Sequence, residues 1–324
     1  MSASLRGIVS LAVIASLAGA CEQARQAPAT VDTTTPPPPT PPDTALSPLP
    51  PPVPWDTAAG PLIVVRGDSG ETAVVVLPQY TDSTLPVARS FDSASVRGAA
   101  LDLFGRTGAV GQARLESVEA FEPGGGACVG WPTVALAAAS GAGATGSAGA
   151  LGGWTVALAR GRATALPLDS IEALPAADSA RLAADVSRLA SALPDTPSSS
   201  FRGLPFTVRT AYRFAPAPGV QAVVADAVRK LNQEANPLQE HTLLIAERDS
   251  TGAGSRFRAV YSERKSGSEE RVESAEILAA LAFGPARRTA LLVSRIGDET
   301  TAYALIERAP SGQWRLRWTS APGC

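Results

Sequence analysis

A run of prolines near the start of the chain sets the strongest limit on what this protein can fold into. Residues 28–54 hold 12 of the 28 prolines in the 324-residue chain. Proline lacks an amide donor and the stretch has few apolar side chains, so it cannot form part of a packed core. We expect polyproline II, in which a rise of about 3.1 Å per residue gives this segment an upper reach of roughly 80 Å. The sequence therefore predicts a disordered spacer ahead of a folded body.

The segment before the spacer is typical of an export signal. Arg6 is followed by a stretch, residues 8–20, that contains only apolar or small residues. Its length fits the apolar part of a signal peptide, about 7–15 residues, and falls short of the roughly 20 residues that a membrane-spanning helix needs. We therefore predict that residues 1–20 are a signal peptide and that the protein is exported.

The residues around the predicted cleavage site allow two interpretations. Ala18-Gly19-Ala20 matches the A-x-A pattern of ordinary secretory cleavage. Together with Cys21, these residues also resemble the lipobox of bacterial lipoproteins, in which small residues precede a cysteine that receives lipid. Ala18 departs from the leucine that the lipobox prefers at this position. The resemblance implies that Cys21 is the lipid-attachment site, that residues 21–54 form a tether, and that the body is held at a membrane of the cell envelope.

Composition and charge exclude several classes of function. A net charge of −2 gives no basis for binding nucleic acid. One histidine and three cysteines supply too few ligands for zinc or multi-histidine metal sites. We predict that the protein binds no cofactor. The partners that we predict are the membrane and another envelope protein or glycan. The proline run could also dock SH3-like or WW-like modules, but these partners are mainly intracellular and export disfavours them.

The cysteines favour one disulfide. If lipid occupies Cys21, then Cys128 and Cys324 remain as an even pair in an oxidising compartment. Cys128 follows three consecutive glycines, and Cys324 lies on a tail that can return to the body. The predicted Cys128–Cys324 bond would stabilise the fold by at most roughly 5 kcal/mol in the chain-entropy model. The alternative is two unpaired buried thiols.

Short β-branched runs separated by turn residues indicate a β-rich first part of the body. Strands are expected at residues 62–66, 72–77, 96–104, 113–121, 129–139 and 154–159, with a hairpin turn at 105–108. Strands this short with turns this frequent are typical of a small barrel or sandwich.

Helical periodicity appears in the second part of the body. Four apolar residues spaced four, three and four apart share one face of a helix over residues 178–193. Similar spacing predicts a second helix over residues 220–234, and a third, short helix is expected over residues 273–281. Further strands are expected at residues 241–248, 256–264, 289–295, 301–308 and 313–319.

The fold class predicted from these patterns is α+β, an antiparallel β-rich body with two or three amphipathic helices. We expect a β-rich subdomain over residues 55–165, a helix and linker over residues 166–200, and an α+β subdomain over residues 201–324.

No complete catalytic motif is present. Residues 262–265 match the S-x-x-K motif of penicillin-binding enzymes but lack its S-D-N and K-T-G elements. Residues 141–146 match G-x-G-x-x-G without a surrounding βαβ unit. His241 is the single histidine, so a triad requires folding to bring a serine and a carboxylate to it. The acidic run Glu269, Glu270, Glu273 and Glu276 is explained by the N-terminus of the expected short helix.

The sequence thus predicts no catalytic, cofactor-binding or metal-binding residue. The function expected is an envelope-anchored lipoprotein that acts as a non-catalytic binding or structural module. The alternative is an exported hydrolase whose site is assembled only by folding. A pocket that holds His241 with a serine and a carboxylate would favour the hydrolase.

Overall fold

The structure, a computed structural model, describes most of the chain from Trp55 onward. The described residues are 55, 60–66, 73–76, 78, 93–119, 128–139, 151–195, 200–232, 237–250, 255–284 and 286–324. The predicted signal peptide, Cys21, the proline-rich tether and residues 141–146 lie outside the described residues. Within the described ranges, no helix combines the length and the apolar character needed to cross a bilayer.

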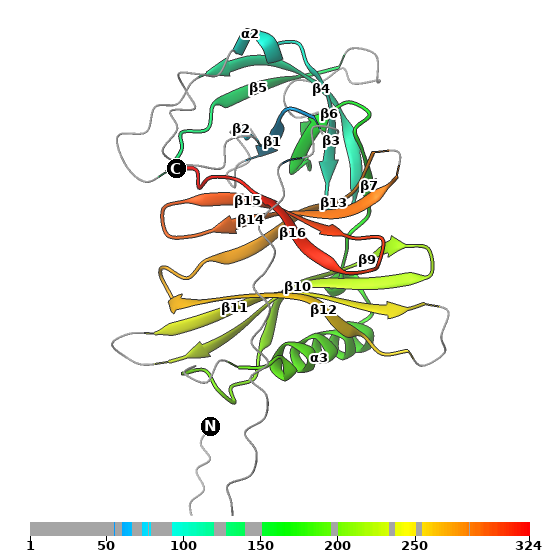
Figure 1. Cartoon of the computed structure of the whole chain (residues 1–324), viewed down its shortest axis with the longest axis vertical. Coiled ribbons are helices and arrows are strands. Elements are labelled where there is room, and N and C mark those ends of the chain that lie inside the picture. The colour runs from blue at the N-terminus through cyan, green and yellow to red at the C-terminus, as the bar shows by residue number, and fades with distance from the viewer. Residues whose placement is uncertain are drawn as a thin grey trace, which may run out of the picture. The chain divides into compact units, whose positions relative to one another are not determined.

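The first part of the body forms a closed barrel (Figure 1). Its strands are β1 (Ile63–Arg66), β2 (Ala73–Val76), β3 (Ala100–Gly105), β4 (Gly108–Glu119), β5 (Thr133–Ala138) and β6 (Val156–Ala159), and a short helix, α2 (Ser93–Val96), precedes β3. Around the barrel the order is β1-β2-β5-β4-β3-β6, with β6 closing on β1. The hairpin between β3 and β4 turns between Gly105 and Gly108, as predicted. A barrel is one of the two architectures that the short strands predicted.

The rest of the body forms two antiparallel sheets of five strands each. One sheet has the order β12-β11-β10-β9-β8 and the other the order β16-β15-β14-β13-β7. The first is built from β8 (Asp169–Ser170), β9 (Thr207–Ala217), β10 (Val220–Leu231), β11 (Leu238–Asp249) and β12 (Arg258–Ser268). The second is built from β7 (Ala163–Leu166), β13 (Ser274–Phe283), β14 (Arg288–Ile296), β15 (Thr301–Arg308) and β16 (Trp314–Thr319). We call them the β8–β12 sheet and the β13–β16 sheet.

Three apolar clusters hold these elements together in layers. The first joins the barrel to one face of the β13–β16 sheet, through residues such as Leu292 and Trp318. The second fills the space between the two sheets and includes Val293 of β14 and Ile245 of β11. The third packs α3 (Ala176–Ala192) and the short 3-10 helix η3 (Ile171–Ala173) against the outer face of the β8–β12 sheet. Figure 1 shows this sequence of barrel, sheet, sheet and helix.

The predicted α+β class with two or three amphipathic helices is wrong. Strands make up 58% of the described residues and helices 11%, so the body is mainly antiparallel β. Of the three helices expected, only the first exists, as α3. The expected helix over residues 220–234 is largely the strand β10, and the one over residues 273–281 lies almost entirely within the strand β13.

Both errors have the same physical cause. β10 is covered by the β13–β16 sheet on one face and by α3 on the other, and residues 222–229 are all buried. β13 lies between the barrel and the other sheet, and residues 277–283 are all buried. A strand buried on both faces loses the alternation of apolar and polar residues that identifies a strand in sequence. What remains is an apolar run that also fits a helix.

Candidate functional site

His241, the residue on which a hydrolase would depend, is buried on β11 with both ring nitrogens occupied. Its Nδ1 lies 3.2 Å from each carboxylate oxygen of Asp226 on β10, and its Nε2 lies 3.3 Å from Oε1 of Gln239. The amide nitrogen of Gln239 donates to Glu269, which orients the amide oxygen toward the histidine. Both ring nitrogens therefore lie within hydrogen-bonding distance of side chains other than serine, a carboxylate and an amide.

The space beside His241 is too small for a substrate. It measures about 10 Å³, close to the minimum that holds one water molecule. Ser274 and Glu273 are among its lining residues, and Asp226, which is fully buried, accepts a further hydrogen bond of 2.5 Å from Nε of Arg209. The pocket that would favour a hydrolase is therefore not formed by the described residues around His241.

The S-x-x-K motif lies within β12 and joins an ion-pair network. Glu263 of this motif accepts hydrogen bonds from the hydroxyl of Tyr261 at 3.0 Å and from Nη2 of Arg295 at 2.6 Å. Burial raises the pKa of Tyr261, and the negative charge of Glu263 raises it further, so this phenol stays protonated. Ser262 sits in the middle of a strand, whereas the acylating serine of penicillin-binding enzymes opens a helix.

Three of the four carboxylates in the acidic run form ion pairs. Glu269 accepts a hydrogen bond of 3.1 Å from Lys230, Glu273 lies 3.4 Å from Nζ of Lys265, and Glu276 pairs with Arg106. Because residues 274–283 form a strand, the explanation from a helix N-terminus is wrong. Each of these three carboxylates is balanced by a basic side chain from another segment of the chain, so the pairs need no ligand to balance them.

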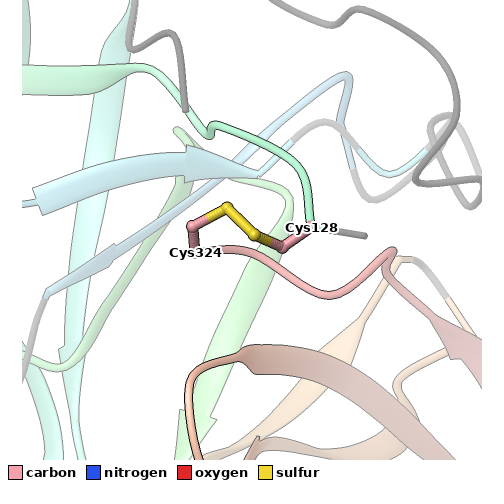
Figure 2. Close-up of a disulfide and its surroundings, with 2 residues drawn as sticks. All are labelled: Cys128 and Cys324. Carbon is pink, nitrogen blue, oxygen red and sulfur yellow. A yellow bond between two sulfur atoms is a disulfide. The ribbon is translucent and has the colours of Figure 1, made fainter. Parts of the chain in front are cut away.

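Cys128 and Cys324 form a disulfide, as predicted (Figure 2). Their Cα atoms lie 5.3 Å apart, within the range of about 4.4–6.8 Å for such bonds. The neighbouring backbone is held on two sides. Val129 donates to the carbonyl of Pro322 at 2.8 Å, and Gly323 donates to the carbonyl of Thr301 at 2.7 Å. The segment Pro322–Cys324 therefore links the chain just before β5 to the start of β15.

A cavity of about 190 Å³ lies beside this segment, between the barrel and the β13–β16 sheet. We call it the junction cavity. Its lining is mixed, and the residues are Val65, Arg66, Val74, Trp131, Leu278, Ser294, Thr301, Tyr303, Gly323 and Cys324. Arg66 carries the only charged side chain in this set. Of the three cavities in this section, it has the largest volume, and the described residues that line it include the fewest charged side chains.

A second cavity, of about 170 Å³, lies between α3 and the β8–β12 sheet. Its lining includes Arg181, Arg213 and Arg248, but also Asp178 and Asp185. Since Asp178 pairs with Arg181 at 2.7 Å and Asp185 pairs with Arg188 at 2.9 Å, much of its charge is neutralised locally. The junction cavity is therefore the stronger candidate for a ligand site.

Sequence patterns did not single out the polar residues of the junction cavity. Ser294, Thr301 and Tyr303 come from two strands, and Arg66 comes from the barrel. No spacing along the chain connects them. Among the described residues, no group of three or more histidines, cysteines, aspartates or glutamates is placed to hold a metal ion.

Comparison with known proteins adds no family to this geometry. No protein-family model, no curated protein and no solved structure matches the chain. The function has to be argued from the residues themselves.

Proposed function

We propose that this protein is an envelope-anchored lipoprotein whose body is a non-catalytic binding module. The observation that carries the proposal is the state of His241. The single histidine of the chain is buried, with both ring nitrogens engaged by Asp226 and Gln239 and with no room beside it for a substrate. The junction cavity, in contrast, has a volume and a mixed lining that suit a small ligand.

The anchor is argued from the sequence. Small residues precede Cys21 as in a lipobox, and residues 28–54 are rich in proline. A stiff spacer after a lipidated cysteine would hold the body away from the lipid headgroups. One acyl chain binds membranes only marginally, so stable anchoring needs the additional acyl chains that a lipoprotein cysteine carries.

Metabolic labelling tests the anchor. Labelled palmitate should enter the wild-type chain and be absent from the Cys21→Ser variant, which should leave the membrane fraction or accumulate as precursor. The Cys324→Ser variant is the matched control, because it loses a different cysteine and should still incorporate label. A wild-type chain that never incorporates palmitate would replace lipid anchoring by plain secretion.

A comparison of His241 variants tests the non-catalytic role. The mature wild-type chain and His241→Gln should behave alike, both inactive, toward ester, amide and glycoside substrates. A hydrolytic activity that purifies with the wild-type chain and disappears in a folded His241→Gln variant would support the exported hydrolase instead. Circular dichroism of the variant separates loss of activity from loss of fold.

A further inference from the structure

We propose that the cavity between α3 and the β8–β12 sheet binds a short organic dicarboxylate, with one carboxylate held by Arg213 and the other by Arg248. We call this cavity the α3 groove. The inference goes beyond the proposed function, because it assigns a second ligand site, on the outer face of the β8–β12 sheet. It is argued from the placement of the two arginines, from their contacts, from the ion pairs around them and from the volume of the groove.

Strand pairing places the two arginines on the same face of the sheet. Arg213 on β9 pairs with Val223 on β10, and Val223 packs in the core under α3. Arg248 on β11 comes two residues after Ala246, which belongs to the same core. Residues two apart on a strand point to the same side, so both guanidiniums extend from the outer face and line the α3 groove. Since only β10 lies between their strands, about 10 Å across two strand spacings, they can hold the two ends of one small molecule.

Arg213 has a buried donor without an acceptor. Its Nε–H is buried and makes no hydrogen bond to the described residues. Its ion-pair partner is the exposed Asp169, whose Oδ2 lies 4.0 Å from Nη2 of Arg213, beyond the length of a hydrogen bond. Buried donors are expected to have acceptors, and a ligand can supply the one that the described residues do not. This donor is the observation that points to an anion.

Arg248 is held in place by groups that do not neutralise its charge. Its Nε and Nη2 donate to the amide oxygen of Gln221 at 2.9 and 2.7 Å. Its guanidinium lies 4.6 Å from the ring of Phe257. An amide oxygen and an aromatic ring orient a guanidinium without supplying a full negative charge. These contacts use Nε and Nη2, so Nη1 remains available to a carboxylate.

The acidic residues of the groove are already paired with arginines of the helix. Asp178 and Asp185 both line the groove. They accept hydrogen bonds from Arg181 at 2.7 Å and from Arg188 at 2.9 Å, respectively. Both pairs lie within α3 and are exposed, so each carboxylate is balanced locally. The excess positive charge of the described lining is therefore carried by the two arginines of the sheet, and two positive charges match the two negative charges of a dicarboxylate.

The volume and the apolar part of the lining limit the ligand. Leu174, Leu182 and Phe257 supply an apolar surface for a hydrocarbon segment. The groove measures about 170 Å³, which at about 30 Å³ for each water-sized group gives room for roughly six such groups. Succinate, with two carboxylates joined by two methylene groups, matches this size and carries a charge at each end. A monocarboxylate of the same length can engage only one of the two arginines.

Calorimetric and NMR titration with succinate, on the mature full-length chain carrying Cys21→Ser and at constant ionic strength, tests the proposal. Binding should be saturable, and the Nε–H resonance of Arg213, assigned from the Arg213→Gln spectrum, should shift with it. The Nε–H resonance of Arg229, which donates to Glu240, should not move. Butyrate lacks one carboxylate and succinamide lacks both charges, so each should bind about tenfold more weakly or worse.

Variants assign the binding to the two arginines. Arg213→Gln and Arg248→Gln should each weaken succinate binding about tenfold or more. In either variant succinate should lose its advantage over butyrate, because one guanidinium remains. Arg114→Gln, which replaces an exposed arginine of β4 outside the groove lining, is the matched control and should bind as the parent chain does. Circular dichroism establishes that the variants are folded, and if one of the two does not fold, the other variant and the butyrate comparison decide.

The proposal is overturned by a non-saturable titration, by butyrate or succinamide binding as tightly as succinate, or by folded variants of Arg213 and Arg248 that bind like the control. The test involves neither the lipid anchor nor the junction cavity. Its failure and the failure of palmitate labelling are therefore separate results.

Discussion

At the scale of single residues, Arg229 shows how the interior charges are balanced. Its side chain is 2% exposed, and it donates to Glu240 at 2.6 Å through Nε and to Asp195 at 2.6 Å through Nη2. The guanidinium also lies 4.6 Å from the ring of Phe206. Glu240 is itself buried. Water therefore cannot stabilise either charge in place of its partner. A buried charge of this kind is tolerated only while its partner is present.

Removing the arginine should therefore be costly. We expect Arg229→Met to lower the free energy of unfolding by about 3–5 kcal/mol, because it leaves Glu240 buried without its partner. Arg229→Met with Glu240→Leu should recover most of this loss, since the pair is then replaced by apolar groups. Urea unfolding measures both. Arg181→Met is the control, since this exposed arginine pairs with the exposed Asp178 and its loss should cost no more than about 0.5 kcal/mol. A loss in Arg229→Met no larger than in the control would contradict the argument.

Asp195 should make stability depend on pH in the acid range. Its hydrogen bond to Arg229 holds the pKa of this carboxyl below its ordinary value of 3.8, with Arg264 adding to the effect. The charged form is favoured in the folded state, so the contribution is complete above the unfolded value and is lost as pH falls through the lower folded value. Asp195→Asn should destabilise the protein at neutral pH, and the difference from wild type should shrink as pH falls below 3.8. Urea unfolding over a pH series measures it; a difference that stays constant into strong acid would contradict the assignment.

At the scale of elements, α3 depends on one apolar stripe. Leu182, Val186 and Ala190 are its buried residues, and they pack on the outer face of the β8–β12 sheet. At the C-terminal end of the helix, Arg264 donates to the carbonyl of Leu193 at 3.1 Å, which satisfies a backbone group that the helix leaves open. Packing on one side and this contact at the end fix the helix on the sheet.

Truncation of the stripe should weaken this attachment. We expect Leu182→Ala to lower the free energy of unfolding by about 2–4 kcal/mol, through lost burial and the cavity that it leaves. Arg188→Ala, on the exposed side of the same helix, should change it by no more than about 0.5 kcal/mol. Thermal and urea unfolding measure both variants. An equal loss in the free energy of unfolding for the two variants would contradict this expectation.

Exposure of one face made α3 and the β3–β4 hairpin easy to predict, although β11 and β14, which are buried along most of their length, were also predicted as strands. α3 shows its apolar stripe because its other face is exposed, and the β3–β4 hairpin shows its turn glycines. β10 and β13 are covered on both faces, and their small and apolar residues fit both the period of two of a strand and the period of 3.6 of a helix. The valines of β10 were the available sign of a strand, since β-branched residues favour strands. β9 was not predicted at all.

The candidate site was less predictable than the fold. The disulfide could be inferred because the predicted lipid attachment at Cys21 left one pair of cysteines and the predicted export supplied an oxidising compartment, and the structure confirms the pair. The junction cavity could not be inferred, because Arg66, Ser294 and Trp131 are brought together only by the packing of the barrel on the β13–β16 sheet. Sequence alone carries no distance between segments so far apart in the chain.

At the scale of the whole molecule, the disulfide joins the barrel to the sheet on which it packs. The bond closes a separation of 196 residues, and the linked segment also pairs with Val129 and Thr301. These contacts form the wall of the junction cavity beside Trp131. The barrel and the sheet already share one apolar core. The disulfide therefore adds a covalent cross-link to an interface that is otherwise held together by packing.

Opening the disulfide should destabilise the body without abolishing its fold. The chain-entropy model sets an upper limit of roughly 5 kcal/mol for a loop of this length, and we expect a loss of about 2–4 kcal/mol in Cys128→Ser with Cys324→Ser. The shared core remains, so the circular dichroism spectrum should keep its β character. Urea unfolding of the wild type with and without reductant should reproduce the difference, while Cys21→Ser should show none of it. Intact mass after alkylation reports whether the bond was present before reduction. Two free thiols in unreduced exported material, or equal stability of oxidised and fully reduced chains, would show that the bond does not hold the barrel to the sheet.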